Sequence, residues 1–127
     1  MLINTQVSLG ELLDKISILI IKEKNIDDSQ KQYHIRNELE VLNKTLENSI
    51  SQSQVKEYIE KLIEINSQLW FIEDDIRDCE RKKKFDQKFI DLARAVYITN
   101  DKRSEIKSEI NNKFGSELVE VKSYEKY

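Results

Sequence analysis

The side chains best suited to binding or catalysis gather in one stretch, Leu69 to Arg103. Its pattern predicts parts of two long helices that are joined by a turn near Phe85. Apolar residues recur there every three or four positions, which is the spacing of one helix face. Thr99, Asn100 and Arg103 occupy positions that this spacing predicts to be buried in the core. A buried arginine needs a carboxylate partner, because an unpaired buried charge destabilises a fold strongly.

The turn near Phe85 predicts which residues face the polar positions. In an antiparallel hairpin of this register Asn100 lies opposite Trp70, and Arg103 lies opposite Asn66 or Ser67. We favour a structural interpretation, in which buried ion pairs and amides fix the helix register. The alternative is a pocket between helices for a small anion, whose carboxylate or phosphate would bind one edge of the guanidinium. The residues predicted to form such a ligand-binding site are Asp14, Lys15, Trp70, Glu73, Arg77, Asn100 and Arg103.

An acidic run raises the question of a metal. It consists of Glu73, Asp74, Asp75, Asp78 and Glu80. Hard cations need several oxygens that converge on one point, and one helix face offers two of these acids at most. Helical i, i+4 pairs, Glu73 with Arg77 and Glu80 with Lys84, explain most of the run. We therefore predict no metal and no cofactor. A magnesium-dependent nucleotide hydrolase is the least favoured alternative, and no catalytic residue is identified.

The composition predicts long amphipathic helices with solvated outer faces. The chain has 127 residues, of which 35% are charged and 39% hydrophobic, with two glycines and no proline. A net charge of −3 argues against general binding to nucleic acid or anionic membrane. No apolar run is long enough for a bilayer, and no secretory signal is recognised, so a cytoplasmic location is expected. The single cysteine, Cys79, excludes an internal disulfide.

The periodicity predicts an all-α fold, an antiparallel bundle of four helices with a long C-terminal helical hairpin. We expect helices at about 9–26, 29–49, 54–83 and 87–114 in one domain, 1–127, with an extended tail at 116–127. Ser8 and Glu11 have the spacing of a capping box, and Gly115 is the expected terminator of the last helix. A strand at Ile16–Ile21 is the alternative for the first element, and the cap favours a helix.

The third helix carries a seven-residue repeat, which predicts near-parallel, coiled-coil-like packing. Its seam consists of Leu62, Ile65, Leu69, Ile72, Ile76 and Cys79. Helices of about thirty residues would be about 45 Å long, so the C-terminal hairpin should extend beyond the two shorter helices. An overhanging apolar stripe is usually covered, so we expect a homodimer or higher oligomer, with a protein partner as a further expectation.

Four strings of the sequence resemble an uncharacterised bacterial family of short helical proteins, over nearly the whole chain. They are LGELLDKISIL from Leu9, LWFIEDDIRDCE from Leu69, FIDLARAVYITNDKR from Phe89 and GSELVEVKSY from Gly115. The resemblance implies an association with glycan or polysaccharide biosynthesis and offers no catalytic residues to carry over. Val121 stands where the family leads us to expect an acid. The functional expectation is an interaction or assembly module.

Overall fold

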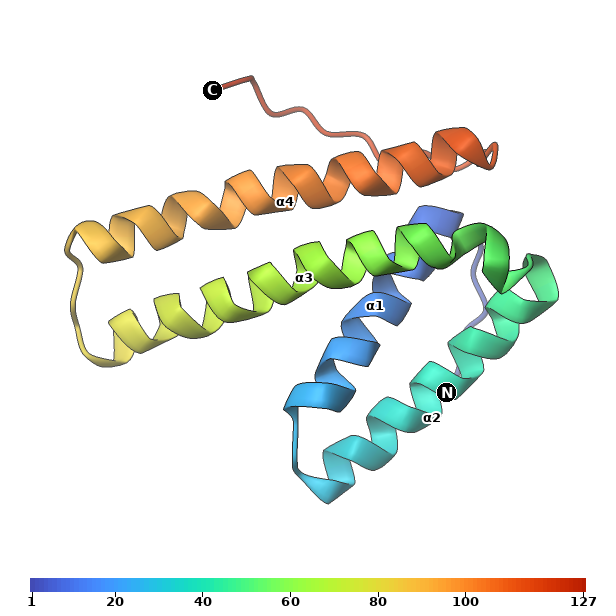
Figure 1. Cartoon of the computed structure of the whole chain (residues 1–127), viewed down its shortest axis with the longest axis horizontal. Coiled ribbons are helices and arrows are strands. Elements are labelled where there is room, and N and C mark those ends of the chain that lie inside the picture. Colours follow the sequence, from blue (N-terminus) through green and yellow to red (C-terminus); the bar gives the residue numbers. More distant parts are fainter.

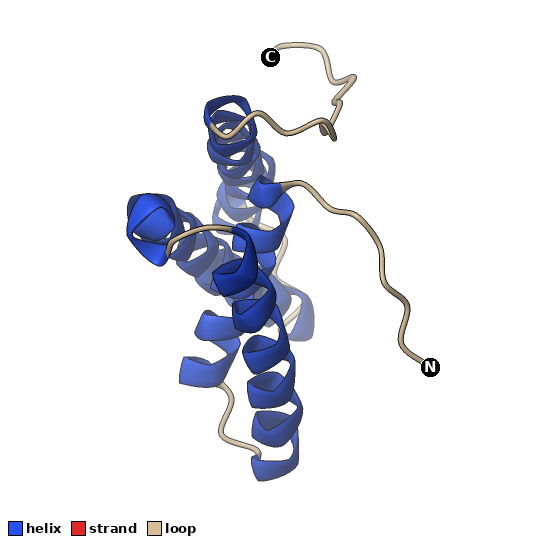
Figure 2. Ribbon diagram, turned by 90° about the vertical axis from the view of Figure 1, so that its right-hand side faces the viewer, coloured by secondary structure: helices blue, strands red, loops and turns tan.

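The computed structural model of all 127 residues consists of helices and loops only (Figure 2). The elements are α1 (Leu9–Asn25), α2 (Ser29–Ser49), α3 (Gln52–Arg81) and α4 (Gln87–Lys113). The segments before α1 and after α4 have no regular secondary structure. The predicted all-α fold is therefore confirmed. The alternative strand at Ile16–Ile21 is wrong, because those residues lie within α1.

The helix starts follow the predicted caps with one difference. Ser8 Oγ accepts a hydrogen bond from the Glu11 backbone N–H at 3.1 Å. The Glu11 carboxylate does not return the bond as a capping box requires, and pairs instead with Lys107 on α4. Asp28 and Asp86 cap α2 and α4 through their side chains.

The helix ends differ from the predicted ones by one or two residues. Helix α3 begins at Gln52 and ends at Arg81, because Lys83 adopts a left-handed backbone with φ of +53°. Helix α4 ends before Gly115, whose φ of +67° confirms its predicted role as terminator.

The four helices form two hairpins that cross. Helices α3 and α4 run antiparallel, side by side, as the seven-residue repeat predicts (Figure 1). Helix α1 packs against both of them, and α2 packs mainly against α1. The α1–α2 hairpin lies obliquely across the longer hairpin, so the near-parallel packing expected throughout the bundle holds only within each hairpin (Figure 1).

The hydrophobic core lies where the two hairpins cross. Its buried residues come from all four helices, so each helix contributes apolar area that folding removes from water. They are Leu12, Leu13, Ile16, Leu46, Val55, Tyr58, Leu62, Ile65 and Ile110.

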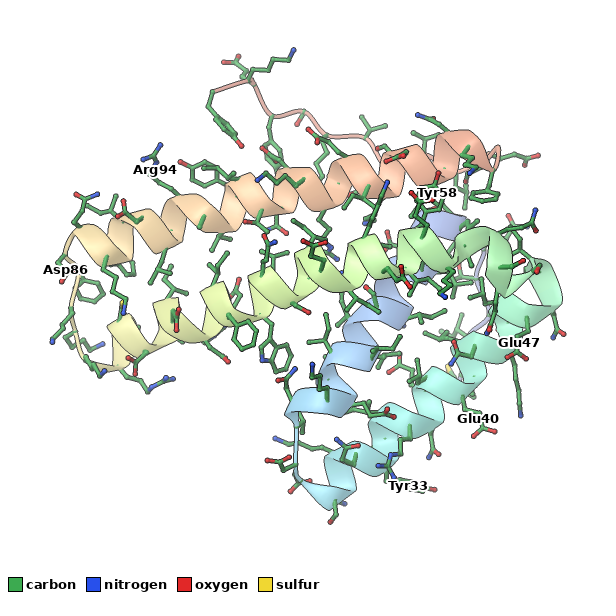
Figure 3. The ribbon with its side chains drawn as sticks, in the orientation of Figure 1. Tyr33, Glu40, Glu47, Tyr58, Asp86 and Arg94 are labelled. Carbon is green, nitrogen blue, oxygen red and sulfur yellow. The ribbon has the colours of Figure 1, made fainter.

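The end of the α3–α4 hairpin that contains its turn extends past the point where the two hairpins cross, as predicted from the helix lengths. We name this part, Phe71–Arg81 of α3 with 87–98 of α4 and the turn between them, the distal hairpin. Figure 1 shows no other helix across it, and Figure 3 shows Asp86 at its turn. Cys79 is its only buried residue. The distal hairpin is thus two helices thick, without a third layer.

Candidate functional site

Helix α1 is attached to the long hairpin by a row of polar contacts, which we name the polar ladder. The Gly10 backbone N–H donates to Asn111 Oδ1 at 2.8 Å. One residue further along α1 and one turn back along α4, Glu11 Oε2 lies 2.9 Å from Lys107 Nζ. At the next turn of both helices Asp14 is bonded to Arg103. The ladder therefore runs towards the C-terminus of α1 and towards the N-terminus of α4.

The pair of Asp14 and Arg103 is the centre of the ladder. Arg103 donates from Nε to Asp14 Oδ1 at 2.9 Å and from Nη2 to Asp14 Oδ2. The Asp14 side chain is 2% exposed and that of Arg103 is 28% exposed. The hydrogen bonds to Asp14 raise the pKa of Arg103 although burial opposes its charge. The guanidinium predicted to lie in the core is therefore half-buried, and its carboxylate partner is Asp14.

Asn66 on α3 completes this centre. Its Nδ2 donates to Asp14 Oδ1 and to Ser17 Oγ, both at 2.9 Å. Ser17 Oγ in turn donates to the Asp14 carbonyl oxygen at 2.6 Å. Arg103 and Asn66 thus meet at one carboxylate, which confirms the hairpin register predicted from the turn. The side chains of three helices are held in one hydrogen-bonded set, and such a set specifies one packing arrangement.

Lys107 is a ladder residue that the sequence reasoning missed. Its ammonium lies 2.9 Å from Glu11 and 2.9 Å from Glu120 of the C-terminal tail, with 9% of the side chain exposed. Burial opposes the charge, but hydrogen bonds to both acids outweigh it and raise the pKa of Lys107. The same contact lowers the pKa of Glu120. Its signal in the sequence is the spacing of Arg103, Lys107 and Asn111, which places them on one helix face.

Gly10 was also missed, and its role is steric. A Cβ atom at this position would lie 2.7 Å from the Lys107 carbonyl oxygen and 2.8 Å from Asn111 Oδ1. No real Cβ makes contacts this short, so only glycine permits α1 to approach α4 so closely at the top of the ladder.

Below the ladder, an open groove of about 610 Å³ lies between α1, α3 and α4. It contains five of the seven predicted ligand-site residues, and Asp14 lies next to it through its bonds to Arg103 and Asn66. The five are Trp70, Glu73, Arg77, Asn100 and Arg103, beside Ile18, Ile21, Asn66, Leu69 and Asp74. Asn100 and Trp70 share the groove, in agreement with the predicted register.

Lys15 is not part of this groove. Its ammonium pairs with Glu38 of α2 at 3.1 Å, and 59% of its side chain is exposed. Lys15 therefore faces α2 and lies apart from the predicted ligand-site residues that line the groove.

Three of the five acids in the acidic run of α3 pair with neighbouring cations. Glu73 pairs with Arg77 at 2.5 Å, and Asp78 pairs with Lys82 at 2.8 Å. Glu80 pairs with Lys83 instead of the predicted Lys84, because the helix ends at Arg81. The structure brings no three acids, histidines or cysteines together in an arrangement that could hold a metal ion.

The C-terminal tail lies along α4 (Figure 1). Besides the bond between Glu120 and Lys107, Tyr127 Oη donates to Asp101 Oδ2 at 2.6 Å. The Tyr127 ring also packs edge-on against Tyr97 at 5.3 Å between centroids. The tail is therefore held on α4 at two separate places.

Comparisons with family models, curated proteins and solved structures found no match for this chain. The family resemblance stays a prediction. No helix has both the length and the apolar character that crossing a membrane requires.

Proposed function

We propose that this chain is a helical interaction module whose binding surface is the distal hairpin. The proposal rests on a change in side-chain burial along the apolar seam of α3. Leu62, Ile65 and Leu69 are buried, whereas Ile72 and Ile76 of the same repeat are only half-buried and Cys79 alone is buried beyond them. Large apolar side chains elsewhere on the distal hairpin are exposed, and they are Phe71 (58%), Phe85 (54%) and Ile90 (47%). A patch of this kind usually marks an interaction site.

The geometry supports a helical protein as the partner. Side chains at spacings of three and four residues form ridges and grooves into which the ridges of another helix fit. An amphipathic helix in an apolar groove is a common mode of recognition. The polar ladder supports the same function, because it fixes the direction in which the distal hairpin projects from the core.

The anion-binding alternative has less support from the contacts in the groove. Nε and Nη2 of Arg103 are bonded to Asp14, and Arg77 is bonded to Glu73. The remaining acid, Asp74, adds a negative charge that would repel an anion. We expect inorganic phosphate and nucleotides, with or without magnesium, to leave the melting temperature unchanged. A rise that the Arg103→Met variant abolishes would instead favour a ligand site.

The proposal is tested by site-specific photocrosslinking in the cells that produce the chain. A benzoylphenylalanine replaces Phe71 or Phe85 in the distal hairpin, and Tyr33 on α2 serves as the control. Tyr33 is also aromatic and is 64% exposed, but it lies outside the proposed surface. We expect a covalent adduct of one defined mass from position 71 or 85 and none from position 33.

Two results would contradict the proposal. One is the absence of adducts from both distal positions, and the other is the same set of adducts from the distal and control positions. In either case the distal hairpin would have no specific partner.

A further inference from the structure

Four residues of α3 form a stripe that continues from the groove into the distal hairpin. Trp70, Asp74, Arg77 and Arg81 follow one another at spacings of four, three and four residues, so their side chains share one helix face. The first three line the groove. Arg81 lies one turn further along, in the part of α3 that has only α4 beside it (Figure 1). We name these residues the α3 stripe.

The charges of the α3 stripe are incompletely matched within the chain. Asp74 is exposed and forms no ion pair, although its neighbour Glu73 is bonded to Arg77. That bond uses Nη1 of Arg77, so other donors of the guanidinium remain free. Arg81 has one exposed contact, at 3.5 Å to Asp78. An acid, two arginines and the half-buried face of a tryptophan are thus available to a partner.

The order of these residues is self-complementary. The midpoint between Asp74 and Arg77 coincides with the midpoint between Trp70 and Arg81, and both fall between Asp75 and Ile76. If two α3 helices meet antiparallel about a two-fold axis at this point, Asp74 of each copy lies opposite Arg77 of the other. Trp70 likewise lies opposite Arg81. Each contact then occurs twice, as an isologous interface requires.

We infer that the partner of the distal hairpin is a second copy of this chain, docked antiparallel on the α3 stripe. The inference rests on the proposed function and names its partner. The two Asp74–Arg77 ion pairs and the two cation–π contacts between Trp70 and Arg81 fix the register. Opposite charges also select this antiparallel arrangement over a parallel one, in which Asp74 would face Asp74.

The same register gives the groove an occupant. Arg81 of the other copy lies opposite Trp70, which lines the groove, so the tip of the partner's distal hairpin, with the exposed Phe85, comes next to the groove in this arrangement. Asn66 lines the groove beside Ile18, Ile21 and Leu69, which offer an apolar floor. The partner's tip therefore brings an exposed aromatic ring to the groove of about 610 Å³ that this apolar surface lines.

The inference is tested by charge reversal, with the oligomeric state measured by analytical ultracentrifugation and the fold by circular dichroism. The wild type should form a dimer of twice the 15.1 kDa chain mass. Asp74→Arg and Arg77→Asp each place like charges opposite one another twice, so each should weaken the dimer by at least about tenfold. The double variant Asp74→Arg/Arg77→Asp should dimerise again, and the two single variants mixed together should form a heterodimer.

A matched control lies next to the stripe. Asp75 is also acidic and exposed, but it is one residue from Asp74 and therefore points to another side of α3. Asp75→Arg should leave the dimer unchanged. Phe85→Ser should weaken the dimer without altering its response to charge reversal.

Two outcomes would overturn the inference, and both can be told apart from failure of the proposed function. A wild type that stays monomeric up to millimolar concentration excludes the second copy, while photocrosslinking to a different protein would still support an interaction module. A dimer that ignores the reversals at positions 74 and 77 uses another surface of the chain. Absence of any distal adduct would remove the proposed function itself.

Discussion

Asp14 on α1 and Arg103 on α4 are joined by two hydrogen bonds although 89 positions separate them in the sequence. The carboxylate is almost fully buried, and Asn66 donates to the same oxygen as Arg103 Nε. The ion pair therefore holds the first helix on the last one and excludes other registers. Loss of this ion pair should lower the free energy of unfolding of the whole domain.

Replacing Asp14 by alanine should lower the free energy of unfolding by about 2 to 4 kcal/mol, because the guanidinium of Arg103 loses its only carboxylate. Urea denaturation measures the change. Lys15→Ala, which removes a neighbouring exposed pair with Glu38, is the control and should cost less than about 0.5 kcal/mol. The double variant Asp14→Leu/Arg103→Met should be more stable than the sum of the two single losses predicts. Strict additivity would mean that the two side chains do not interact.

Gly10→Ala should destabilise the fold by about 1 to 3 kcal/mol, since the added methyl group meets the backbone of Lys107. The usual effect of this change inside a helix is the opposite, a gain of up to about 1 kcal/mol. The sign of the change in unfolding free energy therefore shows whether α1 and α4 are in close contact at Gly10. A thermal or urea melt that shows greater stability would indicate that α1 and α4 are further apart than described.

The tail contact at Glu120 should be lost in acid. Its pKa is lowered from 4.5 by the hydrogen bond from Lys107, so the contact contributes fully above pH 4.5 and disappears as the pH falls through the lowered value. Carbon-detected NMR titration of the Glu120 carboxyl group measures that pKa directly. In Lys107→Met it should return toward 4.5, and an unchanged titration would show that the tail is not held by Lys107.

The other tail contact should be lost in base. The hydrogen bond to Asp101 raises the pKa of Tyr127 to about 12 from 10.0. The contact is fully present below pH 10 and is lost as the pH rises toward 12. NMR titration of the phenol ring carbon, with Asp101→Asn for comparison, tests this sign. The variant should titrate nearer 10.0, and identical curves would contradict the contact.

The two halves of the α3 seam should respond differently to truncation. Leu62 is completely buried, and Leu62→Ala should cost about 3 kcal/mol. Ile76 lies in the distal hairpin and is half-buried, so Ile76→Ala should cost about 1 kcal/mol in the monomer. Urea melts at low protein concentration make the comparison. Equal losses would mean that the distal hairpin carries a core of its own.

The sequence predicts the structural features that follow from helical periodicity and from short turns between helices. The register of α3 on α4 follows from one loop and two regular seams, and Arg103 stands out because a charge interrupts an apolar rhythm. Lys15 was misplaced because its position on α1 suits contact with α2 as well as with the long hairpin, and only the packed structure selects Glu38 on α2 as its partner. Lys107 was missed because its burial depends on Glu11 and on the tail, which local patterns do not bring together.

The polar ladder also determines the order in which the chain can mature during synthesis. Asp14 and Ser17 lie in α1, yet their partners are Asn66 and Arg103, which are translated later. Until then the nascent α1–α2 hairpin keeps hydrated polar groups on the side it must eventually bury, so it cannot complete its core. The packing of α1 consequently waits until α4 has been translated, and we expect a chain cut short within α4 to be more susceptible to proteolysis.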